Sequence, residues 1–136
     1  MKVEAQWQSG FYFKCSSPSN HIVDVDWGAK DSITHGPAPM ELLLHAIASC
    51  TGMDIIFILQ KKRKKPEAFS VIVEGERADT HPKVFTKVKM HYKLQGDELT
   101  GKEVEQAISL SLDKYCSATA MITPKAEVTW DYELTS

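Results

Sequence analysis

Hydrophobic and polar residues alternate with two different periods along this chain, and the order of these periods predicts a mixed α+β fold. Strict alternation in residues 2–7, 11–15 and 21–27 predicts three short strands that form an antiparallel meander. A long apolar segment at residues 37–65 follows and predicts one helix, because it is far longer than an ordinary strand.

The next part of the chain predicts two more strands and a second helix. The strands cover residues 69–78 and 86–94. The second of them alternates most regularly, with one buried face formed by Thr86, Val88, Met90, Tyr92 and Leu94. Thr100 and Glu103 have the spacing of a capping box. We expect a helix over residues 100–115 with one buried stripe, because residues with helical spacing follow: Val104, Ala107, Ile108, Ser111, Leu112 and Tyr115.

Residues 126–134 alternate again and predict a final strand. The element order is therefore βββ-α-ββ-α-β, which we interpret as antiparallel sheets around a long central helix. The acidic face of residues 127–133 should lie beside the basic face of residues 86–93, because opposite charges on neighbouring strands are mildly stabilising.

The long helix dominates the expected packing. Pro39 suits a first helical position, and the basic run at residues 61–65 suits the negative end of the helix dipole. Between these ends nearly every side of the helix is apolar, so it must be buried on all sides. One sheet and one narrow second helix leave part of it uncovered, which predicts a homodimer about a two-fold axis.

Composition narrows the class of protein. The chain has 136 residues, so we expect one domain over residues 1–136. Its net charge of −2 argues against a nucleic-acid partner. His45 and Asp54 lie inside the apolar segment, and an aspartate at a bilayer centre costs about 2.5–3.5 kcal/mol, so we expect no membrane span. Residues 1–7 do not resemble a secretory signal, which favours a cytoplasmic protein.

Three cysteines are the main candidates for chemistry. A free cysteine most often behaves as a small buried hydrophobe, and this remains an alternative for Cys15, Cys50 and Cys116. Asp54 follows Cys50 by one helical turn, so their side chains should be neighbours. A carboxylate in that position disfavours a thiolate, and Asp54 is either a satisfied buried polar group or a functional one.

The sequence contains no short motif that is typical of a metal or cofactor site. The histidines show no His-x-x-x-His pattern, and the cysteines show no Cys-x-x-Cys pattern. No glycine-rich phosphate loop is present either. We therefore expect neither a metal ion nor an organic cofactor.

Several short motifs together form a recognisable pattern. Residues 36–44 read Gly-Pro-Ala-Pro-Met-Glu-Leu-Leu-Leu, residues 49–54 read Ser-Cys-Thr-Gly-Met-Asp, and residues 114–117 read Lys-Tyr-Cys-Ser. Glu76-Arg77 and His81-Pro82 lie between them. These motifs resemble the OsmC and organic hydroperoxide resistance (Ohr) superfamily over nearly the whole chain. Glu76-Arg77 and His81-Pro82 resemble its divergent OsmC-like branch.

The resemblance implies an intertwined homodimer with the long helices at its centre, and thiol-dependent peroxidase chemistry. Cys50 matches the peroxidatic cysteine, which is oxidised to a sulfenic acid, and Cys116 matches the resolving cysteine, which condenses with it to a disulfide. The implied partners are a small hydroperoxide substrate and a dithiol reductant that restores both thiols by exchange.

Two features of the superfamily are displaced in this chain. Ohr proteins carry an activating glutamate ten residues before the cysteine, where this chain has Met40, and Glu41 is one residue later. On an ideal helix Glu41 lies roughly 180° from Cys50, against roughly 80° for position 40. The family's arginine precedes the long helix, whereas the two arginines here are Arg63 and Arg77, so Arg77 is the candidate replacement.

Three functional hypotheses follow. The first is a peroxidase that uses Cys50 and Cys116, with Glu41, Arg77 and Asp54 in supporting roles. The second is a non-catalytic dimeric redox sensor or a module that binds a small apolar ligand in the same interface pocket. The third is a structural dimer whose cysteines are inert.

Overall fold

The computed structural model describes residues 1–136 and divides them into two compact units, Met1–Leu43 and Leu44–Ser136. The first unit contains a three-stranded antiparallel sheet in the order β1 (Glu4–Ser9), β2 (Tyr12–Ser16), β3 (Ile22–Val25), which confirms the predicted meander. One face of this sheet is apolar and exposed to solvent, and Phe11 and Trp27 pack edge to face on it, with ring centroids 5.5 Å apart.

Helix α1 (Pro39–Lys61) begins at the predicted proline but ends four residues before the predicted limit, Lys65. The stop is set by Arg63, which adopts a positive φ of 58°. Its amide donates to the carbonyl of Gln60, and the next amide, of Lys64, donates to the carbonyl of Leu59. This pair of bonds is a Schellman motif, so the local backbone ends the helix before the later proline does.

The second unit contains a three-stranded sheet with the order β4 (Ala68–Arg77), β5 (Phe85–Gln95), β6 (Glu127–Thr135). Strands β4 and β5 form an antiparallel hairpin, whereas β5 and β6 run parallel. The expectation of purely antiparallel sheets is therefore wrong for β6. The reason lies in the connection between β5 and β6. The helical segment after β5 carries the chain back to the end of the sheet at which β5 began, so β6 runs in the same direction as β5.

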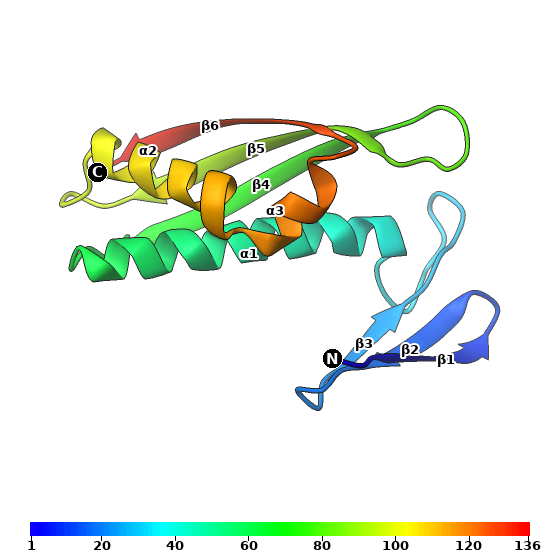
Figure 1. The fold of residues 1–136 in the computed structure, drawn as a ribbon. Coiled ribbons are helices and arrows are strands. Elements are labelled where there is room, and N and C mark those ends of the chain that lie inside the picture. The colour runs from blue at the N-terminus through cyan, green and yellow to red at the C-terminus, as the bar shows by residue number, and fades with distance from the viewer. The chain divides into compact units, whose positions relative to one another are not determined.

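Helix α1 and the helical segment that follows β5 cover the same face of this sheet (Figure 1). The buried face of β5 supplies the centre of the core, and α1 packs upon it with the residues on its inner side. By length and composition alone α1 is apolar enough to cross a membrane, but the core helices of other proteins pass the same test, and here one side of α1 is buried, with Ile47, Thr51, Ile55, Ile58 and Leu59. The largest fully buried apolar side chains of the unit are Ile47, Ile55, Leu59, Val88, Met90, Tyr92, Val104 and Ile108.

The outer face of the sheet carries the predicted charge complementarity. In the parallel register His91 is opposite Asp131, and Lys93 is opposite Glu133. Lys89 Nζ lies 3.6 Å from a carboxylate oxygen of Asp131. The acidic strand therefore lies beside the basic strand, as the alternation of charges predicts.

Helix α2 (Gly101–Leu110) begins with the predicted capping box. The side chain of Thr100 accepts from the amide of Glu103, and the carboxylate of Glu103 accepts from the amide of Thr100. The predicted helix does not continue as a regular α-helix to residue 115. It changes into a π-helical turn, η1 (Ser111–Tyr115), and then into a short helix, α3 (Ser117–Ile122). Tyr115, which was expected on the buried stripe, is 51% exposed because the wider turn rotates it outward.

Candidate functional site

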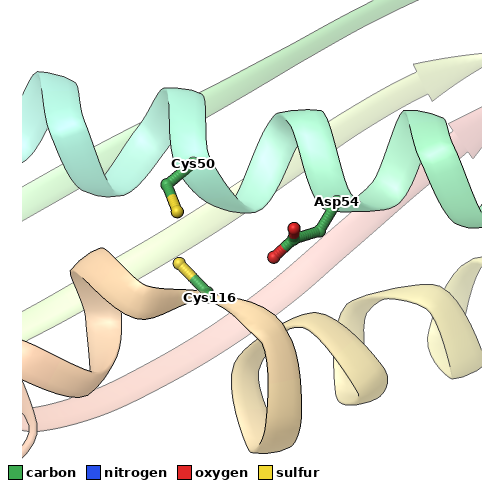
Figure 2. Close-up of side chains that lie close together, drawn as sticks. All are labelled: Cys50, Asp54 and Cys116. Carbon is green, nitrogen blue, oxygen red and sulfur yellow. The ribbon is translucent and has the colours of Figure 1, made fainter.

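Helix α1 presents Cys50 and Asp54 on the side that faces η1 (Figure 2). The two residues are one turn apart, which places their side chains next to each other on the helix surface. Both are half-buried. The inner face of the same helix is fixed by the buried residues Ile47, Thr51 and Ile55, so the direction of Cys50 and Asp54 follows from the packing of α1 on the sheet.

The π-helical turn places Cys116 opposite them. The amide of Cys116 donates to the carbonyl of Ser111 at 2.7 Å, a bond that spans five residues instead of four. Cys116 then caps the start of α3, where its Sγ accepts from the amide of Thr119 at 3.4 Å and lies 3.0 Å from the hydroxyl of Thr119. Only 3% of Cys116 is exposed, so this sulfur is held by its own turn in a fixed position.

The three side chains converge on one point (Figure 2). The Sγ atoms of Cys50 and Cys116 and a carboxylate oxygen of Asp54 all lie within 4.8 Å of one another. Both cysteines are free thiols. The sequence alone left the distance between Cys50 and Cys116 open, and the structure brings the two sulfurs together from segments far apart in the chain.

Burial sets the protonation of Cys116. Removal from water raises the pKa of its thiol above the ordinary value of 9.0, and the neighbouring thiol of Cys50 adds to this effect. The hydrogen bonds from Thr119 act in the opposite direction but are the smaller influence. Cys116 is therefore a neutral thiol at pH 7, which suits a group that donates a proton when it reacts.

A buried chain of hydroxyl groups supports Asp54. The hydroxyl of Ser111 donates to Asp54 Oδ2 at 2.9 Å, and it lies 2.8 Å from the hydroxyl of Thr51. Thr51 in turn lies 2.9 Å from the hydroxyl of Tyr92, which donates to the sulfur of Met90 at 3.4 Å. Burial raises the pKa of Tyr92 to about 12, so this phenol stays protonated.

Sequence reasoning missed the role of this hydroxyl chain. It placed Ser111 and Tyr92 on apolar stripes as ordinary core residues, and both are fully buried. The available signal was the hydroxyl itself, because a buried hydroxyl needs a hydrogen-bond partner. Two hydroxyl residues on facing buried surfaces therefore point to a polar network inside the core.

Glu41 and Arg77 have local partners. The carboxylate of Glu41 accepts from the amide of Ala38 at 3.4 Å, which is a capping contact at the first turn of α1. Arg77 Nε donates to the carbonyl of Lys83 at 2.8 Å across the hairpin between β4 and β5. Cys15 lies on β2 in the first unit and is a free, half-buried thiol. The close cluster in the second unit therefore contains Cys50, Asp54 and Cys116.

A cavity of about 330 Å³ leads to Asp54. Its walls are largely apolar, and two lysines at the end of α1 lie among them. These lysines read as an ordinary solvated helix end in the sequence, but the fold brings them to the same cavity as the carboxylate. The lining residues are Asp54, Phe57, Ile58, Lys61, Lys62, Leu110 and Tyr115.

Comparison with known proteins identifies relatives of the whole chain. Residues 29–131 match the family described as OsmC-like protein. Protein YhfA of Escherichia coli strain K12 is 32% identical over 134 residues, which cover 98% of each chain. A hypothetical protein from Aquifex aeolicus VF5, whose crystal structure is known, is 31% identical with a TM-score of 0.83, over 98% of this chain and 96% of that chain.

A more distant structural relative is an organic hydroperoxide resistance protein OsmC from Legionella pneumophila. It is 16% identical, with a TM-score of 0.72 over 98% of this chain and 97% of that chain. At this identity the likeness establishes a common fold. The mixed α+β architecture with two three-stranded sheets and a long helix is thus the fold of these proteins.

Proposed function

Because the chain belongs to the OsmC-like protein family and places Cys50 beside Cys116, we propose that it is a thiol-dependent peroxidase that reduces organic hydroperoxides. The observation that carries the proposal is the approach of the two sulfurs to within 4.8 Å of each other. A peroxidatic thiol needs a second thiol within reach to form a disulfide, and here both are reduced and facing.

The proposed reaction begins at Cys50, the more exposed of the two cysteine residues. Its thiolate attacks the terminal oxygen of the hydroperoxide, the O–O bond breaks, and the alkoxide that leaves takes a proton to become an alcohol. Cys50 is now a sulfenic acid. The sulfur of Cys116 attacks it, a disulfide forms, and water leaves with the proton from Cys116. An external dithiol then reduces the disulfide by exchange, which completes the cycle.

A cavity beside the cysteine cluster supports a small apolar substrate. The cavity that reaches Asp54 has apolar walls that include Phe57 and Leu110, and its volume suits a small hydroperoxide with a hydrocarbon body. The name of the Legionella relative refers to organic hydroperoxide resistance. Lys61 and Lys62 line the same cavity, so these cations are better placed than Arg77 to compensate negative charge there.

We also propose that the protein acts as a homodimer in the cytoplasm. On α1 the side chains of Met53 and Phe57 are 71% and 58% exposed, and they border an apolar groove between α1 and β4. The apolar sheet face of the first unit is exposed as well. A second copy of the chain would remove both surfaces from water, which is the ordinary reason for a stable interface.

The test is peroxide consumption by the reduced protein with dithiothreitol as the dithiol. We expect turnover with an alkyl hydroperoxide, loss of turnover in Cys50→Ser, and a Cys50 sulfenic acid in Cys116→Ser that dimedone traps. Cys15→Ser is the matched control and should keep the rate. A wild-type rate no higher than that of dithiothreitol alone, or full activity in Cys50→Ser, would contradict the proposal.

A second candidate is a redox sensor that is oxidised once per chain and does not turn over. The local hydrogen bonds of Glu41 and Arg77 favour it, because neither group is then free to activate a thiolate. The same assay separates the two functions. A sensor consumes one equivalent of hydroperoxide per chain and stops, even with excess dithiol, whereas a peroxidase continues.

A further inference from the structure

We infer that Cys50, Cys116 and Asp54 form a binding site for a zinc ion in the reduced protein. The site goes beyond peroxide reduction and does not depend on it, because metal binding requires only the geometry of the ligands. Local sequence spacing predicts no metal. It could not reveal this site, because α1 supplies two ligands while the turn before α3 supplies the third.

The ligand set and its geometry fit zinc. Two thiolates and one carboxylate are among the ligands that zinc prefers, and three protein ligands with one open position are typical of accessible zinc sites. A tetrahedral zinc with Zn–S distances of about 2.3 Å holds two sulfurs about 3.8 Å apart and a sulfur and an oxygen about 3.6 Å apart. The three ligand atoms here lie within 4.8 Å of one another, so small side-chain rotations close the site.

Each of two ligands already has the supporting contacts that metal sites require. Sγ of Cys116 accepts from the amide of Thr119, a contact that stabilises a thiolate. Oδ2 of Asp54 accepts from the hydroxyl of Ser111, which leaves the other carboxylate oxygen free to bind a metal. Ser111 is itself held by Thr51, so the carboxylate has a fixed orientation.

The direct partners of these groups are neutral. They are hydroxyls and a backbone amide, and Lys61 and Lys62 line the cavity beside Asp54 without forming an ion pair with it. Asp54 lines a cavity of about 330 Å³, so this ligand is open to solvent on one side of the cluster. On binding, the two thiols lose their protons to solvent and form two Zn–S bonds, with no change of oxidation state.

The experiment is titration of the reduced, metal-free protein with zinc, in competition with a chromophoric chelator and without peroxide. We expect one zinc per chain. Cys50→Ser and Cys116→Ser should each weaken binding by about 100-fold or more. Ser111→Ala, which removes support from Asp54, should weaken it about 10–100-fold. Cys15→Ser, far along the sequence in the first unit, should leave the affinity unchanged.

A second measurement uses the wild-type protein alone and so does not depend on the folding of variants. Zinc should protect Cys50 from alkylation and leave Cys15 reactive, as read by mass spectrometry of peptides. Cobalt in place of zinc should give the charge-transfer absorption of a thiolate complex. Substoichiometric zinc binding by fully reduced protein, or equal protection of Cys50 and Cys15, would overturn the inference.

The test is separable from that of the peroxidase. Zinc binding is measured on reduced protein before any oxidant is added, whereas peroxide consumption is measured on protein freed of metal by a chelator. Failure of either result therefore leaves the other standing.

Discussion

Ser111 donates a hydrogen bond of 2.9 Å to Asp54 and so joins the π-helical turn to the central helix. The same hydroxyl contacts Thr51, which in turn contacts Tyr92. One buried oxygen thus connects the sheet, the long helix and the segment that carries Cys116. We expect the stability of the second unit and the geometry of the cysteine cluster to depend on this residue.

Replacing Ser111 with alanine removes one partner from Asp54 and one from Thr51. A buried polar group that loses its partner costs about 1–3 kcal/mol, so we expect the free energy of unfolding to fall by that amount. Urea denaturation followed by circular dichroism measures it. Ser49→Ala is the matched control, because that exposed hydroxyl bonds only to carbonyls of its own helix, those of His45 and Ala46. A loss of less than about 0.5 kcal/mol in Ser111→Ala, the range of ordinary surface changes, would contradict the prediction.

The pair His91 and Asp131 should make stability depend on pH. The hydrogen bond to Asp131 raises the pKa of His91 above its ordinary 6.5, and the bond from His91 lowers the pKa of Asp131 below 3.8. The contribution of His91 is therefore complete below pH 6.5 and is lost as the pH rises through its folded-state pKa. The contribution of Asp131 is present above pH 3.8 and is lost as the pH falls through its folded-state pKa.

The pair therefore stabilises the fold most between about pH 4 and pH 6.5. We expect His91→Gln to lower the urea midpoint at about pH 5.5 and to have less effect at about pH 9. His21→Gln, in an exposed loop of the first unit, is the control. An NMR titration of His91 with a midpoint at or below 6.5 would count against this account.

The thiol of Cys116 should react slowly and only at high pH. Burial raises its pKa above 9.0, and only 3% of the residue is exposed. We expect its alkylation by iodoacetamide, followed by mass spectrometry, to have a pH midpoint above 9.0 in the folded protein. The same measurement in urea should restore the ordinary midpoint, because the thiol is then hydrated. Equal midpoints in the two conditions would show that burial does not control this thiol.

A charge on the outer side of α1 should break the proposed dimer. We expect Phe57→Glu to convert the protein into a monomer in sedimentation experiments, because a carboxylate cannot be buried in an apolar interface without a partner. Ile72→Glu is the matched control, since Ile72 is 46% exposed among the charged residues of the outer sheet face. A monomeric wild-type protein, or a dimer that tolerates Phe57→Glu, would argue against an interface at this groove.

Periodicity predicted most elements of the fold, since alternation and helical spacing report which face of a segment is buried. It did not predict the direction of β6, because alternation is the same in either direction. The signal was in the connection: a helix between two neighbouring strands favours a parallel pair. The exposure of Tyr115 was also missed, because an extra residue in a helical turn leaves no mark on the pattern.

The sequence likewise predicted one part of the candidate site and not the rest. Cys50 and Asp54 share a helix, so their proximity was predictable from spacing alone. The approach of Cys116 was implied only by the family resemblance, because no local rule relates residue 116 to residue 50. The hydroxyl chain through Ser111 and Tyr92 required the packed structure, since three separate elements meet in it.

The π-helical turn makes the cysteine cluster sensitive to chain length. One residue of helix corresponds to a rotation of about 100°, so deletion of a single residue within Ser111–Tyr115 would turn Cys116 away from Cys50 while both cysteines remained in the sequence. Insertion or deletion of one codon in this turn is therefore enough to create or abolish the approach of the two sulfurs.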